Sequence, residues 1–167
     1  MALSLSDSPV YMATAQVLDE EMRHRVSLHQ QRRGPQWTNI EEPLWLSRHD
    51  VSGRVVLIDC LTLWLTNLLF HQFPNGQTDH RPNDQPAIGQ VLETAKEEFN
   101  RLANQPNATF IVVTNEIGLG GVSADALQRH FTDLQGWMNQ YVASHADTVI
   151  LMVSGIPVTI KEDHEKI

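Results

Sequence analysis

Short apolar runs alternate along the chain with amphipathic, helix-like segments, and this alternation is what most constrains the fold. Strands that are apolar on both faces need cover on both sides, and helices between successive strands favour parallel pairing. The pattern therefore predicts one α/β domain over residues 1–167, with a mostly parallel sheet and helices on both faces. The segments predicted as strands are 9–15, 55–60, 110–115, 148–154 and the shorter 158–161.

Helix signals fill the intervals between these strands. Apolar residues recur at helical spacing from Leu18 to Val26 and on to His29, and the Gly-Pro pair at 34–35 ends this first long helix. Further helices are predicted over 61–70, 88–102 and 127–141, and the polar, proline-rich segment 71–86 is predicted to be a long loop.

The charge balance narrows the classes of partner. The chain carries 12 Lys+Arg against 20 Asp+Glu, a formal net charge of -8, so it lacks the basic surface that a general nucleic-acid binder needs. The longest apolar stretch, residues 61–70, is too short to span a bilayer, and no signal-peptide pattern is visible. The single cysteine, Cys60, fits a reducing compartment. We therefore expect a cytoplasmic protein with no membrane span and no nucleic-acid partner.

Polar residues follow several of the predicted strands. Parallel α/β sheets bind ligands at the carboxyl ends of their strands. The candidate ligand-binding residues are therefore 14–16, Asp59, 115–116 and 154–155. Asp59 closes an apolar run, which is the pattern of an acid that holds Mg²⁺ in phosphate-transfer enzymes. The position is equally typical of an N-cap for the following helix, and the residues alone leave both interpretations open.

His29 stands out among the eight histidines because Arg32 and Arg33 follow it within one turn. Its spacing from Met22 and Val26 predicts that it points inward. An imidazole beside guanidinium groups can attack a phosphorus atom while the arginines hold phosphate oxygens. The alternative is a half-buried histidine on a packed helix.

Glycines gather after the 110–115 strand, at Gly118, Gly120 and Gly121. Their spacing superficially suggests a dinucleotide fingerprint, but Ser123 takes the third glycine position and no matching strand with a terminal acid follows. We therefore interpret the segment as a turn between strand and helix, with a substrate-contacting loop as the alternative.

Longer motifs run in order from about residue 10 to residue 161. They are YMATAQ, DEEM-x-x-R-V-x-x-H, RRGPQWTNIEEP, VVLIDCLTLWLTNLL, VVTNEIGLG, RHFTDLQGWMNQ and VSGIPVTIK. The ordered set resembles the bifunctional adenosylcobinamide kinase / adenosylcobinamide-phosphate guanylyltransferase family of cobalamin biosynthesis. Any one motif alone is unspecific, whereas the set covers nearly the whole chain.

The resemblance implies a two-step activity. ATP or GTP phosphorylates the aminopropanol hydroxyl of adenosylcobinamide, and GTP then donates GMP to adenosylcobinamide phosphate through a histidine–GMP intermediate. The family's nucleophilic histidine lies four residues after an arginine of the helix, here Arg25, and therefore falls on His29.

The resemblance also implies a homotrimer, Mg²⁺ as a cofactor and a set of binding residues. Asp59 would fill the family's acidic position close to Mg²⁺. The expected nucleotide contacts are Ala15, Gln16, Val17, Arg32, Arg33, Gly34, Pro35 and Glu41, together with Asp59.

The family begins with a strand and a glycine-rich phosphate loop that ends in Gly-Lys-Ser, whose backbone N–H groups cradle phosphates. No G-x-x-x-x-G-K-[ST] motif occurs in the 167 residues. We therefore expect a P-loop NTPase-like (RecA-like) fold that is truncated at its N-terminus. The alternative function is that of a non-catalytic relative, which binds guanine nucleotide or corrinoid without turnover.

Overall fold

The computed structural model describes residues 1–17, 19–73 and 85–162, and a four-stranded parallel sheet forms its centre. β1 (Val10–Ala13) lies between β2 (Thr38–Glu41) and β3 (Val55–Asp59). β4 (Thr109–Val113) pairs with the other edge of β3, which gives the strand order β2-β1-β3-β4. These pairings are all parallel, so the predicted sheet type is confirmed.

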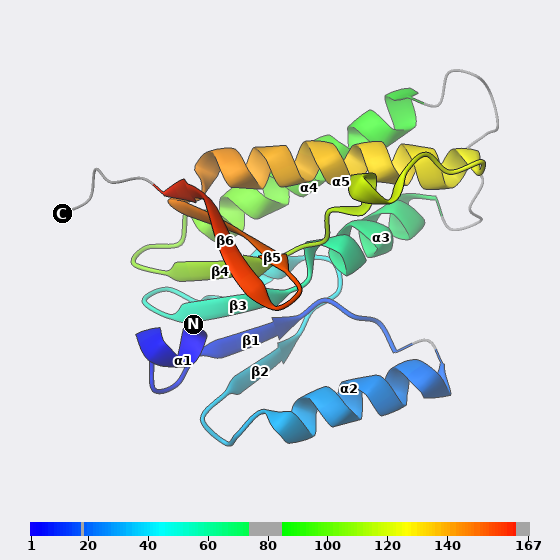
Figure 1. Cartoon of the computed structure of the whole chain (residues 1–167). Coiled ribbons are helices and arrows are strands. Elements are labelled where there is room, and N and C mark those ends of the chain that lie inside the picture. The colour runs from blue at the N-terminus through cyan, green and yellow to red at the C-terminus, as the bar shows by residue number, and fades with distance from the viewer. Residues whose placement is uncertain (18, 74–84, 163–167) are drawn as a thin grey trace.

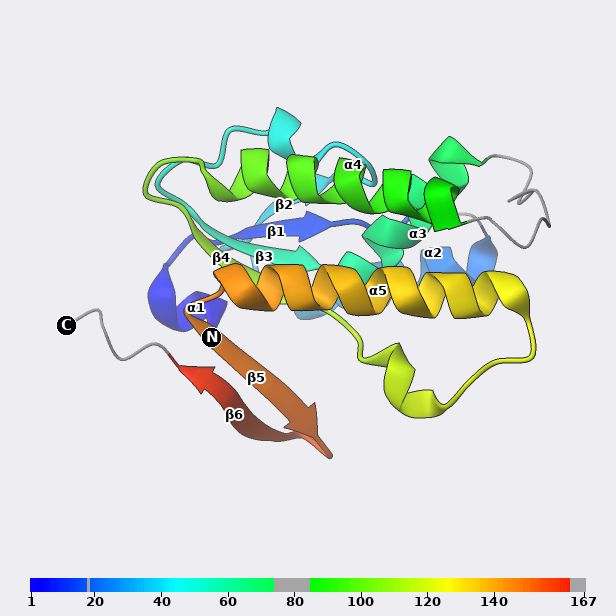
Figure 2. The same cartoon turned by 90° about the horizontal axis from the view of Figure 1, so that it is seen from above.

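Helices cover both faces of this sheet (Figure 1), as the alternating sequence predicts. The elements on one side are α3 (Leu61–Gln72), α4 (Gln85–Ala103) and α5 (Ala126–His145), and α2 (Glu20–Arg32) lies on the opposite side. Figure 2 shows α4 and α5 side by side above the strands. The short helices are α1 (Ala2–Leu5), η1 (Leu46–Arg48) and η2 (Ile117–Gly120). Among the described residues, no helix is long and apolar enough to cross a membrane.

The hydrophobic core lies between the sheet and the helices α3, α4 and α5. Met12 of β1 and Ile58 of β3 are paired in register, and both are fully buried. Trp64 of α3 is also fully buried, and its indole Nε1 donates to the carbonyl oxygen of Leu44 at 2.9 Å. By contrast, no described side chain of α2 is buried. The two faces of the sheet therefore differ, because only one of them supports the main core.

β2 is the strand that the sequence pattern does not reveal. Its four residues, TNIE, are mostly polar, and only Ile40 among them is half-buried while the others are exposed. As an edge strand it pairs with β1 alone. An edge strand needs no continuous apolar run, and such a run is the signal by which buried strands are recognised.

The two C-terminal strands correct one prediction. β5 (Thr148–Val153) and β6 (Ile156–Glu162) exist, but they form an antiparallel two-stranded hairpin separate from the parallel sheet. Ser154 and Gly155 connect them with φ angles of 52° and 78°, the backbone of a tight hairpin turn. Residues 154–155 therefore form a hairpin turn, and the expectation that they end a parallel strand beside the ligand is wrong.

The predicted helix boundaries hold to within a few residues, and the 71–86 loop is shorter than expected. α3 continues to Gln72 and α4 already begins at Gln85. The middle of the predicted loop, residues 74–84, lies outside the described residues.

We predict that Trp64→Phe lowers the free energy of unfolding by about 1–3 kcal/mol, because the Leu44 carbonyl loses its partner and the smaller ring leaves a void. Urea unfolding followed by circular dichroism measures the change. Trp137→Phe is the matched control: this tryptophan is 40% exposed, so we expect a change within about 0.5 kcal/mol. Equal losses in the two variants would contradict the assignment of Trp64 to the core.

Candidate functional site

The carboxyl ends of β1 and β3 are joined by hydrogen bonds. Thr14, the residue after β1, donates through its hydroxyl to the carbonyl of Cys60 at 2.8 Å and accepts from the Cys60 N–H at 2.8 Å. Asn67 of α3 donates to the Thr14 carbonyl at 2.7 Å. Thr14 and Cys60 are both buried, so buried hydrogen bonds hold the ends of β1 and β3 together.

Three side chains form a cluster on the α2 side of this edge. Tyr11 of β1 donates its hydroxyl to the carboxylate of Asp59 at the end of β3. The guanidinium of Arg33, which follows α2, lies over the Tyr11 ring at 3.4 Å from the centroid. Trp37 packs edge-on against the same ring, with 6.0 Å between centroids. We call Tyr11, Arg33 and Asp59 the edge cluster.

The strand period explains why the edge cluster forms. Side chains alternate between the two faces of a strand, so Tyr11 and Asp59 lie on the face opposite Met12 and Ile58. Tyr11 is buried, and burial, followed by the hydrogen bond to Asp59, raises the pKa of its hydroxyl. The phenol thus stays protonated and keeps donating to the carboxylate.

Asp59 does not serve as a helix cap. The N-cap of α3 is Cys60, and no side chain caps this helix, so the N-cap interpretation is wrong. One carboxylate oxygen accepts from Tyr11, and the other has no hydrogen bond within the described part of the chain. Mg²⁺ is commonly held by one or two carboxylates together with substrate phosphates, and a half-buried carboxylate at a strand end fits that role.

Arg33 carries a buried polar atom without a partner. Its Nε donates to the carbonyl of His29 at 3.1 Å, whereas its Nη1 is buried and bonds to none of the described residues. Buried N–H groups are rarely left unpaired. An anionic ligand oxygen is the natural partner for a guanidinium in this position.

Several predicted nucleotide contacts gather beside the edge cluster. A small cavity of about 30 Å³ lies between α2 and the ends of β1 and β2. Ala15, Val17, Arg33 and Glu41 line it, and Glu41 accepts a hydrogen bond from Gln30 of α2 at 3.2 Å.

Among the described side chains, the remaining residues predicted to contact the nucleotide do not line this small cavity. Gln16 is half-buried after β1 and does not line this cavity, while Gly34 and Pro35 lie in the connection from α2 to β2. The side chain of Arg32 lies outside the described residues.

The structure corrects the predicted orientation of the His29 side chain. It lies on the last turns of α2, but its side chain is exposed rather than turned inward. The side of α2 that meets the strand ends is formed by Val26 and Gln30, which line the small cavity with Arg33. Since successive helical residues are rotated by about 100°, His29 points beside that face, toward solvent.

A second polar group holds the end of β4. The sequence points to residues 115–116 of this group but not to the amides of α5 that hold them. Asn139 of α5 accepts from the Thr114 hydroxyl at 2.7 Å and donates to the Asn115 carbonyl at 3.0 Å and the Glu116 carboxylate at 2.7 Å. Gln135 donates to the Thr114 hydroxyl at 2.9 Å. The sequence pattern that could have revealed these amides is the spacing of Gln135 and Asn139, which lie four residues apart and each follow a buried apolar residue of α5.

The glycine-rich segment after β4 forms no dinucleotide fingerprint. It folds into η2 and then an exposed loop that leads to α5. The interpretation as a connection from strand to helix is confirmed, because β4 precedes it and α5 follows it.

Comparison with known proteins identifies the family. Residues 1–160 match the model of the family described as "Cobinamide kinase / cobinamide phosphate guanyltransferase". The chain belongs to this family. The resemblance inferred from the ordered motifs is thereby confirmed, and the parallel sheet flanked by helices is consistent with a P-loop NTPase-like fold.

Individual relatives agree with the family match. The chain is 37% identical over 162 residues to the bifunctional adenosylcobalamin biosynthesis protein CobU of Escherichia coli, covering 93% of this chain and 87% of that protein. It is 37% identical over 155 residues to CobP of Pseudomonas aeruginosa, a protein of the same description, covering 90% and 81%. The corresponding CobU of Salmonella typhimurium is 35% identical over 165 residues, covering 94% and 89%.

We predict that Tyr11→Phe reduces the loss of stability at alkaline pH. The raised pKa of Tyr11 means that the unfolded state releases the phenol proton first, above about pH 10. Below that pH the protonated Tyr11 hydroxyl makes its full contribution to the free energy of unfolding. The contribution falls as the pH rises toward the pKa of Tyr11 in the folded state. Urea unfolding between pH 9 and pH 11 measures the slope.

The matched control is Tyr141→Phe, which removes a hydroxyl bonded to Asn100 at 2.9 Å. We expect this variant to keep the alkaline slope of the wild type. A wild-type slope in Tyr11→Phe would contradict the role given to the Tyr11–Asp59 hydrogen bond.

Proposed function

We propose that this chain phosphorylates adenosylcobinamide and then transfers GMP from GTP to adenosylcobinamide phosphate. Membership of the cobinamide kinase / cobinamide phosphate guanyltransferase family supports the reaction class. The observation that supports a nucleotide site most directly is the buried Nη1 of Arg33, which has no partner among the described residues. The same guanidinium lies over the Tyr11 ring, whose hydroxyl donates to the Asp59 carboxylate.

The nucleotide would bind where α2 approaches the ends of β1 and β2. Arg33 would donate to phosphate oxygens, and Arg32 would add a second cation one residue away. Ala15, Gln16 and Val17 follow β1, and Gly34 and Pro35 follow α2. In this proposal, with Glu41, they contact the nucleoside.

His29 is the proposed nucleophile of the guanylyl transfer. Its exposure leaves the imidazole accessible to a phosphorus atom. A neutral ring nitrogen attacks the α-phosphorus of GTP, a P–N bond forms, and the bond to pyrophosphate breaks while the other ring nitrogen releases its proton. A phosphate oxygen of adenosylcobinamide phosphate then attacks the same phosphorus, and the P–N bond breaks while the imidazole takes up a proton and leaves as the neutral ring.

Asp59 is the proposed ligand for Mg²⁺, which would supply positive charge to neutralise the triphosphate. The Tyr11 hydroxyl orients this carboxylate from one side. In the kinase step the same carboxylate would lie near the phosphates of ATP or GTP.

We also propose a homotrimer on the basis of the resemblance, and light scattering of the purified chain tests it.

We predict that incubation with α-labelled GTP labels the wild-type chain and that His29→Ala lowers the labelling by several orders of magnitude. Because a phosphoramidate bond is labile in acid, the label should survive alkali and be lost in acid. His24→Ala is the control, since His24 is an exposed histidine on the same helix and should label like the wild type.

Labelling of His29→Ala at the wild-type level would overturn the assignment of the nucleophile. Binding of GTP and adenosylcobinamide phosphate by calorimetry without any adduct or turnover would instead support the alternative of a non-catalytic binding protein.

A further inference from the structure

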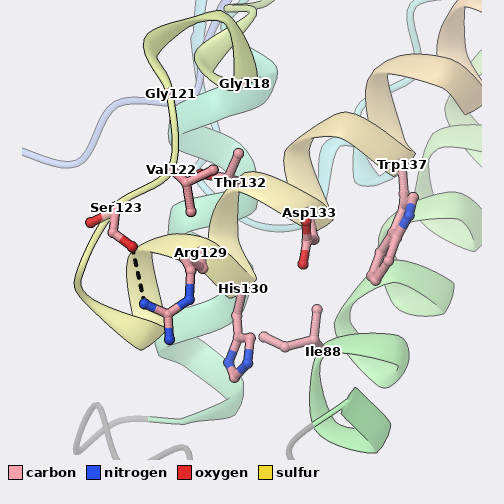
Figure 3. Close-up of a pocket in the computed structure, with 10 residues that line it drawn as sticks. All are labelled: Ile88, Gly118, Gly121, Val122, Ser123, Arg129, His130, Thr132, Asp133 and Trp137. Carbon is pink, nitrogen blue, oxygen red and sulfur yellow. Dashed lines mark hydrogen bonds between the residues drawn. The ribbon is translucent and has the colours of Figure 1, made fainter.

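A larger cavity lies away from the edge cluster, between the loop after η2, the first turns of α5 and the start of α4 (Figure 3). Its volume is about 330 Å³. The loop that forms one wall continues from the carboxyl end of β4. The cavity therefore opens near the same end of the sheet as Asp59, but on the side of α4 and α5 rather than of α2.

Part of the cavity wall is apolar and accessible. Trp137 of α5 is 40% exposed and Val122 of the loop is 89% exposed, whereas Ile88 of α4 is buried beneath. In Figure 3 these three side chains surround the opening from three different elements. Exposed tryptophan and valine side chains in a concave wall are typical of a site that receives an apolar part of a ligand.

Hydrogen-bonding groups lie within this apolar wall. His130 and Asp133 of α5 line the cavity, and Figure 3 shows both on the side that faces it. The Nδ1 atom of His130 is buried and has no hydrogen-bond partner among the described residues. A polar atom in this state favours a ligand that brings a hydrogen-bonding group of its own.

The charges of the cavity do not suit a polyphosphate. Arg129 is the one arginine among the described lining residues, and its Nη1 already donates to the carbonyls of Ser123 and Ala124, at 3.0 Å and 2.8 Å. The Asp133 carboxylate adds negative charge, which repels phosphate. These contacts tie Arg129 to the loop, and the neighbouring Asp133 carboxylate favours a ligand without negative charge.

We propose that this cavity binds the neutral, amide-bearing periphery of the corrinoid substrate. This inference rests on the proposed function, which supplies a corrinoid as the acceptor. A corrin periphery combines hydrocarbon with primary amides, so the hydrocarbon contacts Trp137 and Val122 while amides pair with His130 and Asp133. A volume of about 330 Å³ accommodates part of such a ligand, so the rest of the ring lies outside, over the exposed loop.

Calorimetric titration of the full chain with cobinamide tests this assignment, with GTP titrated separately. We expect His130→Ala and Trp137→Ala each to weaken cobinamide binding about tenfold or more, the scale of one lost hydrogen bond or aromatic contact. GTP binding should stay within about twofold of the wild type. Gln128→Ala is the matched control, since Gln128 is exposed on the same helix and does not line the cavity.

The outcomes separate the two proposals. Wild-type cobinamide affinity in both cavity variants, with folding verified by circular dichroism, would overturn the corrinoid assignment and leave the proposed function standing. A selective loss of GTP affinity would assign the cavity to the nucleotide and also overturn the inference. A wild-type chain that forms the GMP adduct but does not bind cobinamide would overturn both the inference and the acceptor half of the proposed function.

Discussion

The hydrogen bond from the Tyr11 hydroxyl to the Asp59 carboxylate is the contact on which the site depends. It crosses from β1 to β3 at the carboxyl edge of the sheet, and it orients the Asp59 carboxylate. The Arg33 guanidinium lies over the same ring, 3.4 Å from its centroid. A single phenol therefore orients an acidic group through its oxygen and a basic group through its π face.

The two faces of the sheet differ in packing: one carries the hydrophobic core, and the other carries the edge cluster. Met12 and Ile58 face the helices α3, α4 and α5, where the large buried side chains gather. The opposite face carries the edge cluster beneath α2, whose described side chains are half-buried or exposed. Since α2 adds little to the core, its residues are free to be polar. His29 and Arg32 of the nucleotide proposal lie on this helix, and Arg33 follows it directly.

Much of the architecture follows from the sequence because buried parallel strands and amphipathic helices carry strong periodic signals. The polar edge strand β2 lacks such a signal, and the partner of β5 cannot be read from an apolar run, which looks alike in a parallel sheet and in a hairpin. The sequence locates Asp59 at a strand end but not its bond to Tyr11, because pairing register is a tertiary property. Periodicity likewise placed His29 on the inner face of α2, although a sparsely packed helix does not enforce that orientation.

Gln135 and Asn139 of α5 hold the carboxyl end of β4. Asn139 holds the Asn115 carbonyl and the Glu116 carboxylate after β4, and the same helix presents His130 and Trp137 to the larger cavity. The same helix therefore contacts the residues that follow β4 and forms one wall of the cavity. A donor nucleotide on the α2 side and an acceptor on the α5 side would approach a common strand edge, as transfer between two bound substrates requires.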